Sequence, residues 1–453
     1  MEQFAAARRF WHSLCFSLLT ITLLCTAAAA QTTLTLKQAV DRAMTQNNSI
    51  RQALAASQSL DISVRQAQSN YLPEVSASAG WTGSASGRTN TSYGNSVSAG
   101  VSADITLFDG FSRSSLLRSA KGSYAASLGT FEATRQEIMY TVFQYFLQAQ
   151  LDSEVVRIQA ENLLAEQKLL EQIDAFSQSG QKALSDVLTQ KAATAKAELV
   201  LVNARLDYEV AKLNLLKLIG DDYLNASSLT LNALPLGSSD VQLKLSSDTA
   251  LSATLLKRKD VEAQQQTIIA ANENIAAAKS GYWPTVSLSS GLSTGYSKNG
   301  IGNVGDQLFD NNPAASLGLS VSIPIFSKFS TKNSIASAHI KATQEEDNLR
   351  ELKRQVVFEV KQALLSYSAA EEQVRVAQAE VESAQQALDA SQARYEVGAA
   401  TLTDLIQARS VYVTAQNDLI QAQAARVLRT AGTGYYCGGI AGIMKLYTGS
   451  DIQ

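Results

Sequence analysis

Few residues in this sequence have the types and spacing that catalysis requires. The 453 residues include two histidines, His12 and His339, and three cysteines. Cys15 and Cys25 lie in the N-terminal stretch, which leaves Cys437 as the one thiol in the rest of the chain. Neither an intrachain disulfide nor a zinc site of clustered cysteine and histidine is therefore expected.

Two further patterns could be mistaken for functional sites. The stretch 432–439 is rich in glycine like a phosphate loop, but it lacks the Lys-Ser/Thr ending and no predicted strand precedes it. We interpret it as a flexible tail. The acid pairs at 345–346 and 371–372 lie in helical patterns and indicate solvated faces rather than catalytic carboxylates. We predict a protein that is not an enzyme, with no catalytic residues, no metal site and no cofactor.

The most informative residues belong to a turn that occurs twice. Gly180 and Gly398 lie 218 residues apart, and each separates two long helical patterns. A constant offset across a turn and its flanks indicates an internal repeat. The same offset relates Ser185 to Thr403 and Asp186 to Asp404.

Long coiled-coil helices must position these turns. Apolar residues before the second turn step by four and three, a 3.5-residue repeat typical of left-handed coiled coils. The first-half pattern over 113–172 has roughly 60 residues and would span on the order of 90 Å as one helix. Asp152, Gln159 and Glu166 interrupt its apolar seam, and we expect them to face a wet interior. The unbroken set comprises Val356, Val360, Ala363, Tyr367, Ala370, Val374, Ala377, Val381, Ala384 and Leu388.

Two β-hairpins are predicted, at 74–108 and 285–326. Each follows a helix that stops before proline, at Tyr71-Leu72-Pro73 and at Tyr282-Trp283-Pro284. Apolar residues alternate with serine, glycine and threonine along the strands, which gives one apolar and one polar face. The second hairpin is seven residues longer, and we place the extra residues in its loop.

Strands of about 10 residues with one apolar face suit a transmembrane barrel, although periodicity alone leaves surface hairpins on a soluble helical protein equally open. A barrel in lipid must close, and four strands are too few to close one. Several chains would have to share the barrel. Trp81, Tyr93 and Tyr296 fit either an aromatic girdle or ordinary hairpin aromatics.

The N-terminus predicts export. Residues 1–30 have the basic start, short apolar run and Ala28-Ala29-Ala30 end of a signal peptide. Cys25 follows Leu24 rather than the small residue of a lipidation signal, so lipidation is not expected. The domain plan is a first repeat at 31–220, a connector at 221–247, a second repeat at 248–430 and a C-terminal tail at 431–453. The net charge of −3 gives no basic surplus for nucleic acid.

Together these residues resemble the TolC-type outer-membrane efflux protein family of channel-tunnels. The match rests on the 34–40 run, the two helix-to-strand junctions, the 257–263 run and the two glycine turns, in order within a duplicated plan. The resemblance implies a mainly α fold with β: an internally duplicated coiled-coil tunnel and four strands of a 12-stranded transmembrane β-barrel shared by a homotrimer. It implies a place in the outer-membrane lipid, extending into the periplasm.

The resemblance also implies a function for each group of residues. The chain would be a passive exit duct for small toxic compounds, type I protein secretion or both, driven by an inner-membrane pump or ABC exporter through a periplasmic adaptor (membrane fusion) protein. The barrel-side junctions are Tyr71, Pro73, Tyr282 and Pro284. The adaptor-docking tips are Gly180, Ser185, Asp186, Gly398, Thr401 and Thr403.

Asp404 and Tyr395 match the residues that form the family's periplasmic aperture and gate. Three copies of Asp404 around an axis would favour cations. Asp404 equally fits a helix N-terminal acid, with Thr401 or Thr403 as the cap. Where some members have an arginine and a second acid, this chain has Ala400 and Gln407, so its gating contacts must differ. The alternative function is a periplasmic coiled-coil adaptor or scaffold, but an adaptor normally has one helical hairpin rather than two repeats. The sequence does not identify the cargo.

Overall fold

The computed structural model describes residues 32–86, 92–221, 229–234, 254, 257–298 and 300–437. These residues divide into two compact units. The first unit combines the chain up to 48 with 136–245 and with 361 onward, and the second combines 49–135 with 246–360. The predicted signal peptide, most of the predicted connector and residues 438–453 of the predicted tail lie outside the described residues.

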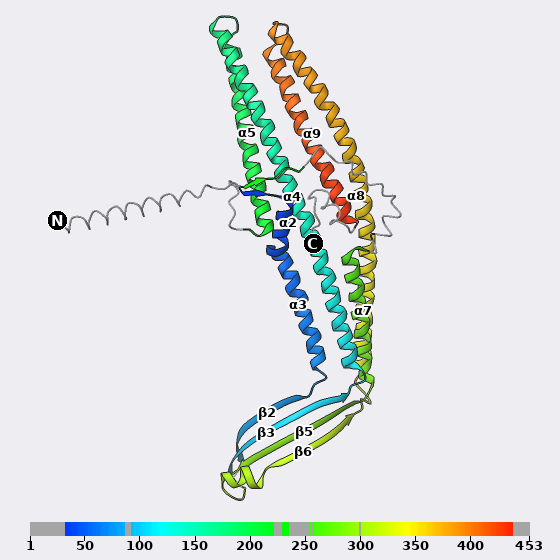
Figure 1. The fold of residues 1–453 in the computed structure, drawn as a ribbon. Coiled ribbons are helices and arrows are strands. Elements are labelled where there is room, and N and C mark those ends of the chain that lie inside the picture. Colours follow the sequence, from blue (N-terminus) through cyan, green and yellow to red (C-terminus); the bar gives the residue numbers. More distant parts are fainter. Residues whose placement is uncertain are drawn as a thin grey trace, which may run out of the picture. The chain divides into compact units, whose positions relative to one another are not determined.

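The first unit contains two long helical hairpins (Figure 1). Helix α4 (Ser112–Gln178), which enters this unit at 136, is followed by α5 (Leu184–Ile219). Helix α8 (Ser330–Glu396), which enters it at 361, is followed by α9 (Leu402–Tyr436). The unit also holds β1 (Thr32–Leu34), α2 (Leu36–Gln46) and β4 (Leu229–Leu231).

The second unit contains one antiparallel sheet of four strands, in the order β2-β3-β5-β6. Strands β2 and β6 are its edges. The unit also contains the first parts of α4 and α8, together with shorter helices. The bounds are α3 (Asn48–Ser69), β2 (Glu74–Ser86), β3 (Ser92–Phe108), α7 (Lys259–Lys279), η2 (Ser280–Tyr282), β5 (Thr285–Ser297), η3 (Asp306–Asn311) and β6 (Ala314–Ser322).

The alternation along the strands gives the sheet two different faces. The strand register places Ala77 opposite Val101, Val101 opposite Leu292 and Leu292 opposite Ala315, which are all apolar residues. The other face carries serine, glycine and threonine. Apolar side chains on the first face are exposed, and two thirds of the Leu292 surface is accessible (66%). The unit therefore presents an apolar sheet face to its surroundings.

The coiled-coil prediction for α8 is confirmed. Seven of the ten predicted seam residues are buried: Val356, Val360, Ala363, Ala370, Ala377, Ala384 and Leu388. Alanine at most of these positions allows helices to approach closely. Burial of this stripe, rather than intrinsic helix propensity, is what stabilises a helix of 67 residues.

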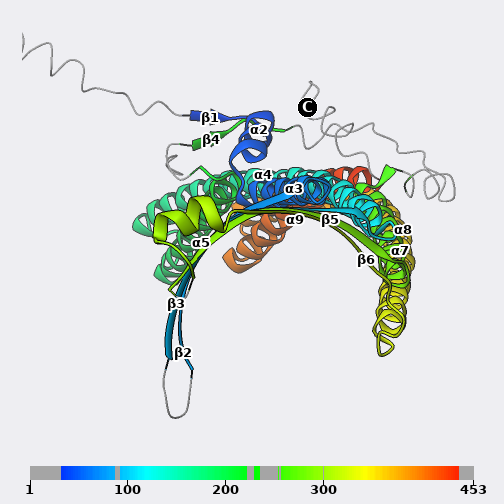
Figure 2. The same ribbon diagram turned by 90° about the horizontal axis from the view of Figure 1, so that it is seen from below.

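The first unit also contains a small sheet that the sequence did not indicate. Strands β1 and β4 pair in parallel beside α2 (Figure 2). The buried side chain of Gln150 donates to the Leu234 carbonyl oxygen at 2.7 Å and accepts from the Leu234 N–H at 2.9 Å. The Gln150 side chain therefore bonds both backbone groups of Leu234, as a neighbouring strand would, and holds the segment after β4 against α4. Gly220 caps α5 in the left-handed conformation.

The internal repeat is visible in the turns that follow β3 and β6. Gly110 and Phe111 both have positive φ, and so do Lys328 and Phe329 at the same offset of 218. Each turn also contains an edge-to-face pair of phenylalanine rings, with centroids 5.5 Å apart in the first and 5.7 Å apart in the second. The same unusual backbone and the same ring contact in both halves support the duplication.

Three local predictions need correction. The predicted first helix is interrupted at Asn47, whose side chain donates to the Leu218 carbonyl oxygen. The second hairpin's last strand ends at Ser322, before Pro324, which cannot donate to a ladder. The predicted flexible tail is wrong for 431–436, because α9 continues to Tyr436 and Gly432 is buried against Tyr140.

Candidate gate and docking tips

The two repeated turns are built on the same backbone conformation. Gly180 has φ 76° and Gly398 has φ 75°, a region that side chains rarely adopt. No other atom lies within 4 Å of where a Cβ would stand at either glycine. Glycine is needed here for the backbone conformation alone, because the surrounding space would admit a side chain.

The two turns differ in how their second helix begins. In the second turn the Thr401 hydroxyl accepts from the Asp404 N–H at 3.2 Å, and the Asp404 carboxylate accepts from the Thr401 N–H at 2.9 Å. This reciprocal pair is a capping box. The capping role predicted for Asp404 is confirmed, with Thr401 as the cap. At the corresponding place in the first turn, Ala183 makes no side-chain cap.

Asp404 is fully exposed, and its hydrogen bonds stabilise the charged form of its carboxyl. The Thr401 N–H, then the Thr401 hydroxyl and finally the nearby Arg394 guanidinium lower the pKa of the Asp404 carboxyl. Arg394 also donates to the Ala399 carbonyl oxygen at 3.2 Å. The second turn therefore has an arginine close to Asp404, although it comes from α8 and not from position 400.

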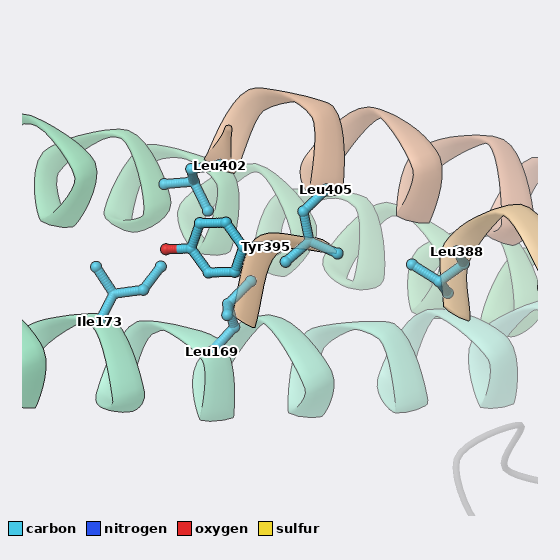
Figure 3. Packing of buried hydrophobic residues seen from close by; sticks show 6 residues of the cluster. All are labelled: Leu169, Ile173, Leu388, Tyr395, Leu402 and Leu405. Carbon is cyan, nitrogen blue, oxygen red and sulfur yellow. The ribbon is translucent and has the colours of Figure 1, made fainter. Parts of the chain in front are cut away.

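Tyr395 lies at the centre of the contact between the two hairpins (Figure 3). Its side chain packs among the buried residues Leu169, Ile173, Leu388, Leu402 and Leu405. Burial, followed by the negative charge of Asp186, raises the pKa of the Tyr395 phenol. The Lys182 ammonium stands 4.2 Å from the centre of the ring. A residue of the first turn thus contacts the last turn of α8 through a cation–π interaction.

One polar layer crosses the helices deeper in the same unit, and we define it as Glu166, Gln190 and Arg409. Glu166 and Gln190 are both buried. The Gln190 amide donates to the Glu166 carboxylate and, at 3.2 Å, to its backbone carbonyl oxygen. An Arg409 nitrogen lies 3.7 Å from the Glu166 carboxylate. The polar layer links α4, α5 and α9 by charge and hydrogen bonding.

The other predicted tip residues occupy the places that the repeat gives them. Ser185 and Thr403 are exposed one residue before Asp186 and Asp404. Ala400 packs against the Tyr395 cluster, and Gln407 is exposed on α9. The structure thus brings both turns and Tyr395 together in one unit. The aperture role of Asp404 and Tyr395 and the docking role of the tips stay predictions.

The predicted barrel-side junctions all belong to the second unit. Pro73 directly precedes β2, and Pro284 directly precedes β5. The Arg113 guanidinium lies 4.8 Å from the Tyr71 ring centre and donates to the Asn70 carbonyl oxygen at 3.2 Å. Tyr282 ends the short helix η2 and is exposed. Each helix-to-strand change is therefore made at a proline, as predicted.

Sequence reasoning missed Lys182, Arg394 and the polar layer. Glu166 could have been recognised as unusual from the sequence, because it interrupts an apolar seam. The prediction that Gln159 and Glu166 face a wet interior is wrong. Both are buried in the chain. Gln190 and Arg409 could not be paired with Glu166 from sequence, because nothing in the pattern fixes which helices share that layer.

The described residues offer neither a metal site nor a helix that spans a membrane. In 32–86, 92–221, 229–234, 257–298 and 300–437 no group of three or more histidine, cysteine or acidic side chains is placed to hold a metal ion. Across that same part of the chain, none of the helices combines the length and the apolarity needed to cross a bilayer.

Duplicated pairs of long helices, with a sheet that exposes one apolar face, fit the class of proteins that contact a membrane through a sheet. The profile of the outer membrane efflux protein family matches this chain twice, at residues 39–221 and 250–431. The chain belongs to that family and is an outer-membrane efflux protein. The two matched ranges correspond to the two predicted repeats, at 31–220 and 248–430.

Known relatives match most of the chain. The cation efflux system protein CusC of Escherichia coli K12 is 25% identical over 387 residues, covering 84% of this chain and 81% of CusC. The pyoverdine export outer membrane protein OpmQ of Pseudomonas aeruginosa is 24% identical over 410 residues, covering 84% and 82%. A crystal structure of CusC superposes with a TM-score of 0.76 at 20% identity, covering 89% of this chain and 92% of that one. The structural likeness shows a shared fold.

Proposed function

We propose that three copies of this chain form a passive duct across the outer membrane and the periplasm. Three sheets of four strands would close a 12-stranded barrel, and the paired helices would line a tunnel. A periplasmic adaptor protein and an inner-membrane pump or ABC exporter would dock at the two glycine turns and supply the energy. The family membership supports this proposal, and it disfavours the alternative of an adaptor or scaffold without a channel.

The observation that carries the proposal is the open sheet with one exposed apolar face. Strands β2 and β6 are edge strands, each hydrogen-bonded on one side only. In lipid an unpaired edge leaves backbone groups without partners, which costs several kcal/mol for each group. Pairing β2 of one copy with β6 of the next removes both edges. The apolar face then meets lipid, and the face of serine, glycine and threonine lines the pore.

A second stripe of exposed apolar residues supports assembly of the helices. Leu199, Val202, Leu206, Val210 and Leu213 step along α5 by three or four residues, and at least two fifths of each side chain is exposed. Such a stripe is typical of a helix that packs against another helix. A neighbouring copy is the partner that a closed trimer supplies.

Disulfide trapping tests the edge pairing directly. In a Cys437→Ser background, Ala77→Cys on β2 is combined in turn with Ala315→Cys, Leu317→Cys and Leu319→Cys on β6, all on the apolar face. One combination should give a covalent trimer on gels after oxidation, and the single-cysteine variants should not. The purified protein should also conduct as a single channel in a planar bilayer. A mature chain recovered as a soluble periplasmic monomer would refute the proposal.

The proposed cargo is small toxic compounds, secreted proteins of a type I system, or both. CusC is named for cation efflux and OpmQ for pyoverdine export, so relatives of comparable identity carry different cargo. Deletion of the gene should increase sensitivity to toxic compounds or metal ions if the duct serves efflux. Loss of a polypeptide from the culture medium without such sensitivity would assign it to secretion.

A further inference from the structure

A cavity of about 350 Å³ lies in the first unit, beside the Tyr395 cluster. One wall comes from α4, the opposite walls from α8 and α9, and Lys182 of the first turn completes it. Leu169, Ile173 and Leu405 supply apolar surface, and all three are buried. Volume and apolar lining both fall in the range of small-molecule sites, which begins at roughly 300 Å³.

The charged residues around this cavity are mainly cations. Lys168, Lys182 and Arg409 line it, against the single carboxylate of Glu396. Arg409 faces Glu166 at 3.7 Å. Within the described part of the chain, neither Lys168 nor Lys182 forms an ion pair, and the Lys182 ammonium lies 4.2 Å from the centre of the Tyr395 ring. The cavity therefore combines an apolar floor with two ammonium groups that lack a counter-ion.

Ligands that satisfy both features have a restricted chemistry. A neutral apolar molecule would fill the floor but leave the ammonium groups without a counter-ion. A small inorganic anion would pair with the lysines but leave the apolar walls in contact with water. A carboxylate or sulfonate attached to a ring system matches both, because the ring covers the floor and the anion lies between the lysines.

We propose that this cavity binds a small amphipathic organic anion, which bridges Lys168 of α4 and Lys182 of the first turn while its ring packs on Leu405 of α9. Such a ligand joins both helical hairpins of the first unit. Binding therefore stabilises the arrangement seen here and slows separation of the two turns. The site is built from residues of one chain, and its ligand binding does not require that the chain form a channel.

A fluorine NMR titration of the full-length protein in detergent tests the site, with 6-(trifluoromethyl)-2-naphthoate as the probe. The corresponding carboxamide, which keeps the ring system but is uncharged, shows how much affinity the ring alone supplies. Lys168→Gln combined with Lys182→Gln should weaken naphthoate binding roughly tenfold, because both ammonium groups that would pair with the carboxylate are removed. Lys191→Gln combined with Lys196→Gln removes the same charge from exposed positions of α5 outside the cavity and should change nothing.

A second variant keeps the test independent of charge. Ala165→Phe places a ring in the cavity wall and should abolish binding of naphthoate and carboxamide alike. Equal naphthoate affinities in wild type and in the Lys168/Lys182 double variant would overturn the proposal, and so would equal affinities for the acid and the amide. If naphthoate does not bind while a purified adaptor protects Lys168 and Lys182 from acetylation, the surface is a protein contact and the proposal is wrong. Conductance of ligand-free channels tests the proposed duct separately.

Discussion

Removing Arg409 should destabilise the region around the turns far more than removing an exposed arginine. Arg409 and Glu166 have side-chain exposures of 13% and 7%, so solvent cannot replace either partner. Breaking a buried pair costs about 3–5 kcal/mol, because one charge is left without compensation. Gln190 still donates to Glu166 in Arg409→Met, so we expect the lower limit, about 3 kcal/mol. At ~1.4 kcal/mol for each factor of ten, local opening becomes roughly 100-fold more frequent.

Native-state proteolysis of the turns reads out this opening, and hydrogen exchange over 160–195 and 400–412 localises it. The matched control is Arg375→Gln, which breaks a pair on α8 whose partners are both mostly exposed (69% and 60%), so water replaces the lost partner and local opening should stay close to that of the wild type. Glu166→Gln should cost about 3 kcal/mol by the same argument, because it leaves the charge of Arg409 buried without compensation.

A double-mutant cycle separates the pair from its surroundings. Glu166→Gln combined with Arg409→Met should cost about 2 kcal/mol in all, less than the sum of the single changes, because neither charge remains. Additive costs would show that the two residues do not interact in the assembled protein. An Arg409→Met opening rate equal to that of Arg375→Gln would refute the burial argument itself.

Three further predictions concern the turns. Asp404→Asn should reduce the cation preference of the channel and its block by divalent ions. Thr401→Val, which breaks the cap but keeps the charge, should change neither. Unchanged selectivity in Asp404→Asn would leave Asp404 only the capping role. Hydrogen bonds lower the pKa of Asp404, so the cap is stabilising above the ordinary carboxyl pKa of about 4 and is lost as pH falls through the lowered value. Proteolysis of the second turn should therefore accelerate only below about pH 4. Asp404→Asn should show no such acid dependence. Gly180→Ala and Gly398→Ala should each cost about 1 kcal/mol from backbone conformation, but Gly220→Ala should cost more in the same unfolding assay, because its Cβ would also lie 2.9 Å from the Gln46 carbonyl oxygen.

The repeat, the helices and the strands could be predicted because each depends on a local period. The stripe from Val356 to Leu388 repeats every 3.5 residues, and the strands alternate with period two, so the chain's own spacing specifies the buried face. Prolines 73 and 284 fix the boundaries between the two periods. The turns after β3 and β6 show the same repeat in the structure, because Phe111 and Phe329, which lie 218 residues apart, both have positive φ.

Contacts between distant segments could not be predicted, because no period encodes which helices become neighbours. Gln150 holds Leu234 across 84 positions of sequence, and its amide looks like any other polar residue on a helix. Gly432 lies in a stretch whose composition predicts a loop. The buried contact with Tyr140 and the ring stacking of Tyr140 on Tyr435 keep the helix continuous there. Tertiary packing overrides local preference at that position.

The two turns show how duplicated residues can acquire different roles. Asp404 is engaged by Thr401 in a cap, so its position is fixed by its own helix. Asp186 has Ala183 where the second turn has Thr401, and without that cap its charge acts on Tyr395 of the other hairpin. Lys182 contacts the same ring. Replacing Ala183 with threonine should therefore draw Asp186 into a cap and lower the pKa of the Tyr395 phenol, which ultraviolet titration of tyrosine would detect. An unchanged titration would show that Asp186 does not act on Tyr395 through its free carboxylate.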